Sequence, residues 1–166
     1  MMRRLLLLPL ILTLAACGLH PLYGGGTSGP VAGLLRTVQV APIPGQDGWL
    51  VRTKLVDRLG ETGSAPARYR LDVTLDDNIT SYGLSSTQAA TQERRSLRAR
   101  YQLVDVTNGM VVLDETAGSD ASIDVVSSQY ATVAAEQTAL ENLAGIVADQ
   151  IMARLAVYAT RTAPAR

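Results

Sequence analysis

The sequence predicts an α+β fold: a two-layer sandwich in which a mostly antiparallel sheet of about four strands carries two helices on one face. Two segments alternate apolar and polar residues with the period of a strand, and an Asn-Gly pair separates the second of them from a further apolar run. The last thirty or so residues repeat apolar side chains every three or four positions. Strand, helix, antiparallel strands and a long final helix together favour helices packed on one face of a sheet.

The chain begins with a pattern typical of a secretory signal peptide, residues 1–16. Arg3 and Arg4 give a positive start, and the apolar run Leu5–Leu14 is about half the roughly 20 residues that a bilayer-spanning helix needs. The run ends in Leu14-Ala15-Ala16-Cys17, which resembles a bacterial lipobox. In a lipobox the cysteine sulfur takes a diacylglycerol and the amine freed by cleavage takes an acyl chain such as palmitate. We therefore predict cleavage before Cys17 and its lipidation.

Lipidation of Cys17 predicts the location of the protein. Two or three acyl chains hold a protein at a membrane, whereas one does so only marginally. Gly18 stands where an aspartate would favour retention in the inner membrane, so we expect a lipid-anchored protein on the periplasmic side of a Gram-negative outer membrane. Cys17 is the only cysteine, so no disulfide is available, and its covalent lipid is the only cofactor expected.

The mature chain is predicted to have three parts. Residues 17–33, which include a glycine-rich stretch, form the lipidated N-terminus and a flexible tether. Residues 34–160 suffice for a single α+β domain but are short for two, and residues 161–166 form a disordered tail. Removing Arg3 and Arg4 reduces the 15 basic residues to 13 against 15 acidic ones, so the net charge of −2 favours no particular partner.

A strand and a helix are predicted to open the domain. Residues 35–43 contain β-branched side chains and end at prolines, which is typical of a strand that stops there. Asp47 is predicted to cap a helix over residues 48–59, which Gly60 ends. The apolar side of this helix is predicted to contain Trp49, Val51, Leu55, Val56 and Leu59.

Three strands are predicted to follow, at residues 68–76, 96–106 and 110–119. Alternation places one set of side chains in the core: Tyr69, Leu71, Val73, Leu75, Leu97, Ala99, Tyr101 and Leu103. Residues 78–93 are polar and small, and are predicted to be a loop or a hairpin tip that carries Tyr82 and Leu84. Asn108-Gly109 predicts a tight hairpin, and Ser122–Ser127 extends the sheet or leads into the last helix.

The last predicted element is a helix over residues 129–159, with Ser128 as its cap. About 45 Å of helix would lie diagonally across a four-stranded sheet. Its apolar stripe is predicted to consist of Tyr130, Val133, Ala134, Leu140, Leu143, Ala144, Val147, Ile151, Leu155 and Tyr158.

The sequence carries no catalytic constellation. His20 is the only histidine and lies three residues from Cys17, which excludes a histidine-dependent triad or a multi-histidine metal site inside the domain. The pairs Asp76-Asp77 and Asp114-Glu115 fall at predicted strand ends, where solvated carboxylates are expected. We therefore predict no enzyme and no metal site, and export without net positive charge disfavours nucleic-acid binding.

Arginine is the informative residue type. Six of the mature chain's 13 basic residues fall in two stretches: Arg68 and Arg70, and Arg94, Arg95, Arg98 and Arg100. If the two strands are neighbours, alternation places most of these guanidinium groups on the outward face of the sheet. Such groups bind phosphate through two hydrogen bonds, so this face would fit an anionic glycolipid or a negatively charged partner. A solvated face balanced by Asp72 and Asp76 remains the alternative.

The stretch "CGLHPLYG", residues 17–24, resembles the start of mature lipoproteins of the LptE (RlpB) family. Alphaproteobacterial members begin with cysteine, glycine, an apolar residue, a variable one and Pro-Leu-Tyr-Gly, and the order of elements agrees over the mature chain.

The resemblance implies a non-enzymatic outer-membrane lipoprotein that plugs the LptD β-barrel and assists lipopolysaccharide transport and insertion. It also implies that basic residues of the sheet contact lipopolysaccharide. The candidates for contact with its phosphates are Arg94, Arg95, Arg98, Arg100, Arg68 and Arg70. The alternative function is a lipoprotein auxiliary subunit of an ABC-type envelope lipid-transport system.

Overall fold

A computed structural model describes residues 29–60, 66–84 and 90–162 of the chain. The signal peptide, Cys17 and the motif at residues 17–24 lie outside the described residues. The elements are α2 (Pro30–Leu35), β1 (Val38–Val40), α3 (Gly45–Leu59), β2 (Tyr69–Leu84), β3 (Ala90–Asp105), β4 (Met110–Asp124) and α4 (Gln129–Thr162).

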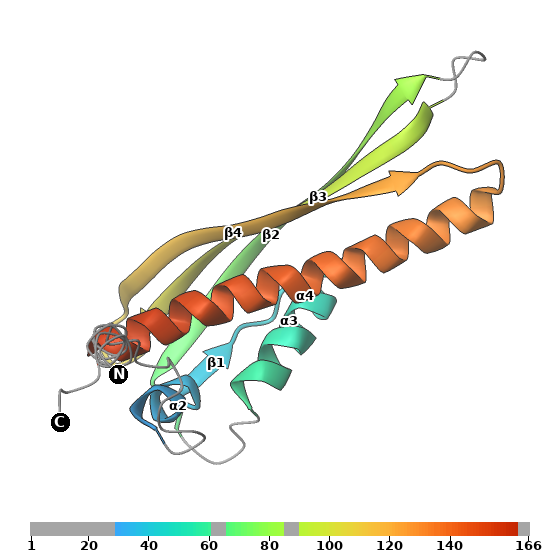
Figure 1. Ribbon diagram of the computed structural model, residues 1–166. Coiled ribbons are helices and arrows are strands. Elements are labelled where there is room, and N and C mark those ends of the chain that lie inside the picture. Colours follow the sequence, from blue (N-terminus) through green and yellow to red (C-terminus); the bar gives the residue numbers. More distant parts are fainter. Residues whose placement is uncertain (1–28, 61–65, 85–89, 163–166) are drawn as a thin grey trace, which may run out of the picture.

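The strands form one mixed sheet in the order β1-β2-β3-β4. β1 runs parallel to β2, and the other two pairings are antiparallel. The helices lie on one face of this sheet, and α4 runs along it diagonally (Figure 1). The predicted α+β class and the long final helix on one face of a four-stranded sheet are thus confirmed.

The core lies between the sheet and α4. All but one of the predicted inward side chains of β2 and β3 are buried, and Leu75 is partly buried and packs against them. Each large apolar side chain that is fully buried contributes about 1.5–3 kcal/mol. Residues from all seven elements join this one cluster, from Val31 in α2 to Ala159 in α4.

The start of the domain differs from the prediction. Residues 30–35, expected partly as tether and partly as strand, form the short helix α2, which has proline at its first turn and buries Val31 and Leu35. β1 is consequently only three residues long. Pro44, rather than Asp47, is the residue at which α3 is capped, and Asp47 lies in the first turn, where the helix dipole favours a carboxylate.

Four apolar side chains assigned to the buried sides of helices are exposed: Trp49, Tyr130, Val133 and Ala134. Trp49 in α3 is 63% exposed because the buried stripe of that helix is centred on Leu50, Val51 and Leu55. Tyr130 in α4 is 86% exposed because the first turns of this helix project past the region where the core lies.

The strands β2 and β3 are longer than predicted. Residues 78–84 and 90–93, expected as a loop, continue the antiparallel pairing as far as Leu84 and Ala90, and residues 85–89 lie outside the described residues. This outer half of the hairpin is held by backbone pairing with few buried apolar side chains. Periodicity could not reveal it, since apolar alternation arises only where one face of a strand is buried.

The hairpin predicted at Asn108-Gly109 is confirmed. Gly109 has a φ of 72° and donates its N–H to the carbonyl of Asp105 at 2.8 Å. The side chain of Asp105 accepts the N–H of Thr107, and that of Asn108 accepts the N–H of Met110, each at 2.9 Å. These bonds fix the turn that joins β3 to β4.

The helix α4 begins as predicted, with the hydroxyl of Ser128 accepting the N–H of Ala131 at 3.4 Å. By length and composition alone α4 would be able to cross a membrane, but half of its most apolar stretch is buried in the domain. Its apolar side covers the sheet, so within this fold α4 is a core helix.

Candidate functional site

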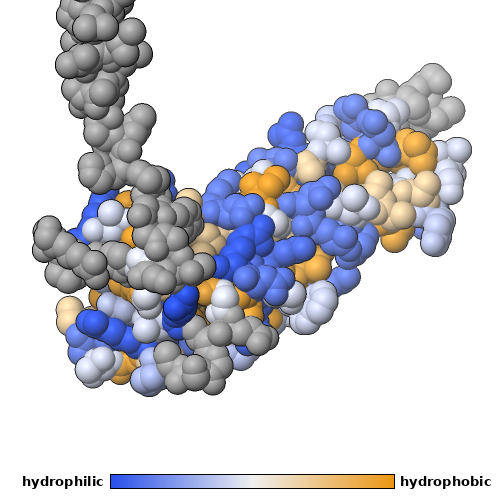
Figure 2. Space-filling view, turned by 60° about the horizontal axis from the view of Figure 1, so that its bottom comes forward, coloured by the Kyte–Doolittle hydropathy of each residue, from blue (hydrophilic) through white to orange (hydrophobic). Residues whose placement is uncertain are grey.

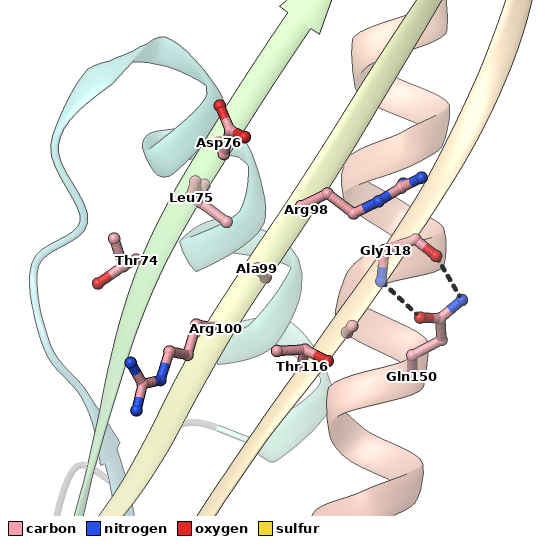
Figure 3. Close-up of a pocket in the computed structure, with 10 residues that line it drawn as sticks. Thr74, Leu75, Asp76, Arg98, Ala99, Arg100, Thr116, Gly118 and Gln150 are labelled. Atoms are coloured by element: carbon pink, nitrogen blue, oxygen red, sulfur yellow. Dashed lines mark hydrogen bonds between the residues drawn. The ribbon is translucent and has the colours of Figure 1, made fainter.

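The candidate site is the outer face of the sheet, the face turned away from α3 and α4. Register places Thr74 beside Arg100 and Asp76 beside Arg98, and on the other side of β3 the same two arginines pair with Thr116 and Gly118. Figure 3 shows these residues in front of the strands, with both helices behind. The predicted outward orientation of Arg70, Arg98 and Arg100 is therefore confirmed.

Each of these three arginines forms an ion pair with an aspartate on the same face. Arg98 binds both carboxylate oxygens of Asp120, at 3.0 and 2.9 Å, and Arg100 binds those of Asp114, at 3.1 and 2.8 Å. Arg70 pairs with Asp72 within its own strand at 2.9 Å. The outer face therefore carries positive and negative charges side by side and is not uniformly positive.

These pairs also shift the pKa values of their members. Hydrogen bonds from Arg100 and Gln102 lower the pKa of Asp114 to about 2. The hydrogen bond to Asp72 raises the pKa of Arg70, and the one to Asp114 raises the pKa of Arg100. All of these groups remain charged near neutral pH, so the face offers bidentate guanidinium donors with carboxylates already bound to them.

An open groove of about 700 Å³ runs across the middle of this face (Figure 3). Its lining comes from three strands and includes Thr74, Arg98, Arg100 and Thr116. Gly118 leaves room for the Arg98 side chain, because a Cβ there would lie 2.5 Å from Cδ of Arg98, whose guanidinium crosses the strand to reach the carbonyl of Ser119. The groove is thus floored by small residues and edged by two guanidinium groups.

At the edge of the groove, Gln150 reaches from α4 to the backbone of β4. Its side-chain amide accepts the N–H of Gly118 at 2.9 Å and donates to the carbonyl of the same residue at 3.3 Å (Figure 3). A single side chain thereby satisfies both outward-pointing backbone groups at this point of the edge strand.

Arg94 occupies the same face nearer the hairpin tip, without a carboxylate partner among the described residues. Its guanidinium lies 5.6 Å from the centre of the Tyr82 ring, whose hydroxyl donates to Ser122 at 3.3 Å. Tyr82, predicted to be part of a loop, is therefore a strand residue that supports an arginine.

Arg95 lies on the opposite face of the sheet from the other arginines of β3. It forms two hydrogen bonds with Asp77, and it donates to the carbonyl of Glu136 in α4 at 2.8 Å. Its side chain is only 12% exposed. This arrangement makes Arg95 a link between the hairpin and α4.

Arg68 precedes β2 and lies at the other end of the sheet. Its guanidinium is 5.2 Å from the centre of the Tyr69 ring and 3.8 Å from a carboxylate oxygen of Asp105.

Asp76 and Asp77, predicted to end a strand, lie within β2 and point to opposite faces of the sheet. Cys17 lies outside the described residues.

Hydrophobic side chains gather at the end of the molecule where α4 begins (Figure 2). The exposed apolar residues of this part include Ile79 in β2, Val126 after β4 and Val133 in α4. The sequence indicates exposed apolar residues only at the hairpin tip. The structure shows further exposed apolar residues in the segment that follows β4 and in the first turns of α4.

Comparison with models of known protein families gives one match. The model of the family described as "LptE: Lipopolysaccharide-assembly" matches residues 35–155, which is most of the chain. No curated protein sequence matches the chain significantly.

Solved structures share the architecture. A protein of Caulobacter crescentus CB15 described as a lipoprotein has 25% sequence identity and a TM-score of 0.68, over 82% of this chain and 100% of the other. Rare lipoprotein B of Shewanella oneidensis has 11% identity and a TM-score of 0.58, over 75% and 95% of the two chains. A minor lipoprotein of Acinetobacter baumannii has 16% identity and a TM-score of 0.54, over 74% and 92%. The last two likenesses show a common fold.

Proposed function

Since this chain belongs to the LptE lipopolysaccharide-assembly family, we propose that it is an outer-membrane lipoprotein that plugs the LptD β-barrel and assists lipopolysaccharide insertion. The family match over residues 35–155 carries this proposal. The fold shared with rare lipoprotein B and the lipobox ending at Cys17 support it. The role is one of binding and positioning, without catalysis.

The proposed anchor is a covalent lipid on Cys17, with no other cofactor. It would hold the domain on the periplasmic side of the outer membrane by its acyl chains. In this position the elongated sheet and its helices would enter a barrel as one body (Figure 1).

The proposed contact for lipopolysaccharide phosphates is the outer face of the sheet. Arg98 and Arg100 are half or more exposed, and exposed ion pairs contribute only about 0–1 kcal/mol, so a phosphate can replace their aspartate partners at little cost. Arg94 can accept a phosphate without displacing a carboxylate. Arg70 and Arg68 would extend this contact toward the other end, while Arg95 would support the hairpin from behind.

The plug is tested by purifying the full-length lipoprotein from outer membranes in mild detergent and identifying the stoichiometric partner by mass spectrometry. We expect a large β-barrel protein at a ratio of one to one. Recovery of an ABC-type permease or its ATPase in place of a barrel would contradict the proposal.

The phosphate contact is tested by titrating lipopolysaccharide into a variant that combines Arg94→Ala, Arg98→Ala and Arg100→Ala. We expect about tenfold weaker binding and a smaller salt dependence, because guanidinium–phosphate pairs are charge-assisted. Arg154→Ala is the control, since Arg154 is 62% exposed and paired with Glu115 but belongs to α4. Equal affinities for the two variants would remove the outer face from the proposal.

A further inference from the structure

The β3–β4 hairpin carries a cluster of exposed apolar side chains. Val106, Met110 and Val111 are 48, 63 and 49% exposed, and they lie within six positions of one another. A single exposed apolar residue is ordinary, whereas three exposed at one turn favour a contact of that turn with an apolar environment. We call these three residues the apolar tip.

The turn that presents the apolar tip satisfies much of its own backbone. The N–H groups of Thr107, Gly109 and Met110 are all bonded within the turn, to Asp105 or Asn108. Moving a segment out of water costs little free energy only when its backbone N–H and C=O groups have hydrogen-bond partners within the protein. The apolar tip is therefore suited to a partly dehydrated environment.

The apolar tip lies at the end of the domain where the N-terminal tether enters. Register aligns Val38, Tyr69, Asp105 and Met110 in one row across the four strands. Three strand spacings place the ends of this row about 14 Å apart. α2 precedes β1 directly, and Figure 1 shows α2, the end of α4 and the start of β4 at the same end of the molecule.

A lipid on Cys17 would keep this end close to a bilayer. Gly29, the first described residue, follows Cys17 by twelve positions, and a fully extended chain of that length spans at most about 43 Å. The β2 strand, with 16 residues, is itself about 50 Å long. The hairpin tip at the far end of the sheet therefore lies much farther from the entry of the tether than the apolar tip does.

Three arginines lie at the same end of the domain as the apolar tip. Arg36 at the end of α2, Arg68 before β2 and Arg161 in the last turn of α4 are all exposed. The ring of Tyr158, one turn before Arg161, contacts that of Tyr69, which places the end of α4 beside this row. Guanidinium groups at the same end as exposed apolar side chains match the phosphates and the acyl boundary of a phospholipid leaflet.

We propose that the apolar tip inserts into the headgroup region of the phospholipid leaflet that holds the acylated Cys17. This proposal rests on the lipoprotein part of the proposed function and requires neither a barrel nor lipopolysaccharide. The lipid and the hairpin are then two separated contacts with the same leaflet. Together they fix the orientation of the domain, because the far end of the β2–β3 hairpin is the part most distant from both contacts.

The test places a nitroxide on the apolar tip of the acylated, full-length protein. Cys17 is the only cysteine and its sulfur is consumed by the lipid, so Met110→Cys creates a single labelling site. The protein is reconstituted into vesicles of phosphatidylethanolamine and phosphatidylglycerol, and collision of the label with oxygen and with a water-soluble nickel chelate is measured. Tyr130→Cys is the control, because Tyr130 is 86% exposed and lies at the opposite end.

We expect the label at position 110 to lose access to the nickel chelate on reconstitution and the label at position 130 to keep it. Equal access at both positions in a protein that floats with the vesicles would overturn the insertion while leaving the lipid anchor standing; the hairpin would then be a surface for a protein. A protein that does not float with the vesicles would overturn the anchor itself, and with it the lipoprotein part of the proposed function.

A second measurement separates the hairpin from the anchor. In the unacylated Cys17→Ala chain, combining Met110→Ser and Val111→Ser should weaken flotation with the same vesicles by about tenfold, because two partly buried apolar side chains no longer leave water on insertion. Both positions are about half or more exposed, so the fold should not change. Unchanged flotation of this variant relative to Cys17→Ala alone would overturn the proposal.

Discussion

Two ion pairs on the β3 strand differ in how much water reaches them. The side chains of Arg95 and Asp77 are 12 and 19% exposed, whereas those of Arg100 and Asp114 are 66 and 36% exposed. Removing one member of a buried pair leaves a charge without a partner in a medium of low polarity. An exposed pair leaves its members to water, so the same change costs little.

We therefore expect Asp77→Ala to lower the free energy of unfolding by about 3 kcal/mol, and Asp114→Ala to lower it clearly less. Urea unfolding of the Cys17→Ala chain, followed by circular dichroism, measures both. A combined Asp77→Leu and Arg95→Met variant should recover most of the loss, because it removes both charges. Similar losses for the two single variants would show that the less exposed Arg95–Asp77 pair contributes no more to stability than the Arg100–Asp114 pair.

The stability of the protein should fall in acid in a way that depends on Asp114. Its pKa is lowered to about 2 in the folded protein by bonds from Arg100 and Gln102, against about 3.9 in an unfolded chain. A carboxyl with a depressed pKa contributes stability that is present above the unfolded value and lost as the pH falls through the folded one. Between about pH 4 and pH 2 the midpoint of thermal unfolding should therefore drop less in Asp114→Asn than in the unchanged protein. Parallel profiles would contradict this assignment.

The position of each arginine relative to its strand was predictable in part. Arg98 and Arg100 alternate with buried Leu97 and Ala99, so their outward orientation followed from the sequence. Arg95 shares the parity of Leu97, and this signal already indicated the inner face. The aspartates of β4 that pair with the outer arginines also alternate, but their partners depend on register, which one strand's sequence does not specify.

Among the elements, α4 combines a buried stripe with an exposed first segment. Leu143 is 1% exposed and Val133 is 55% exposed, although both belong to the apolar periodicity of the sequence. Leu143→Ala should cost about 2–5 kcal/mol of unfolding free energy, since it opens a cavity in the core. Val133→Ala should change it by no more than about 0.5 kcal/mol. Equal losses in denaturant titrations would mean that the start of α4 is as closely packed as its middle.

The sequence predicted the elements whose patterns come from burial or from turn chemistry. α3, the inner halves of β2 and β3, the Asn108-Gly109 hairpin and α4 all carry such patterns. The short helix α2 was missed because six residues hold too few apolar positions to show a period. The outer half of the β2–β3 hairpin was missed because backbone pairing without a buried face leaves no alternation.

At the scale of the whole molecule, apolar packing is concentrated toward one end of a long sheet. The core cluster includes Leu71 and Val73 of β2, whereas residues 78–83 of the same strand contribute nothing to it. Local opening requires less free energy where fewer apolar contacts must break. The two halves of one strand should therefore differ in stability.

Amide hydrogen exchange should reveal this gradient. We expect the amides of β2 that pair with β3 to exchange much more slowly over residues 70–76 than over 78–83, because only the first group is tied to the core. Exchange followed by NMR or mass spectrometry resolves the two halves. Uniform protection along the strand would show that the outer half of the hairpin is held by more than its backbone pairing.

The side chain of Gln150 on the backbone of Gly118 has a consequence for copies that share a membrane. Lipid-anchored proteins diffuse in two dimensions and meet one another far more often than free ones do, and an open strand edge invites a neighbour's edge to pair with it. By occupying both backbone groups at the middle of β4, Gln150 divides that edge into two short lengths. If Cys17 carries the proposed lipid, edge-to-edge pairing between anchored copies would therefore be disfavoured at the middle of β4.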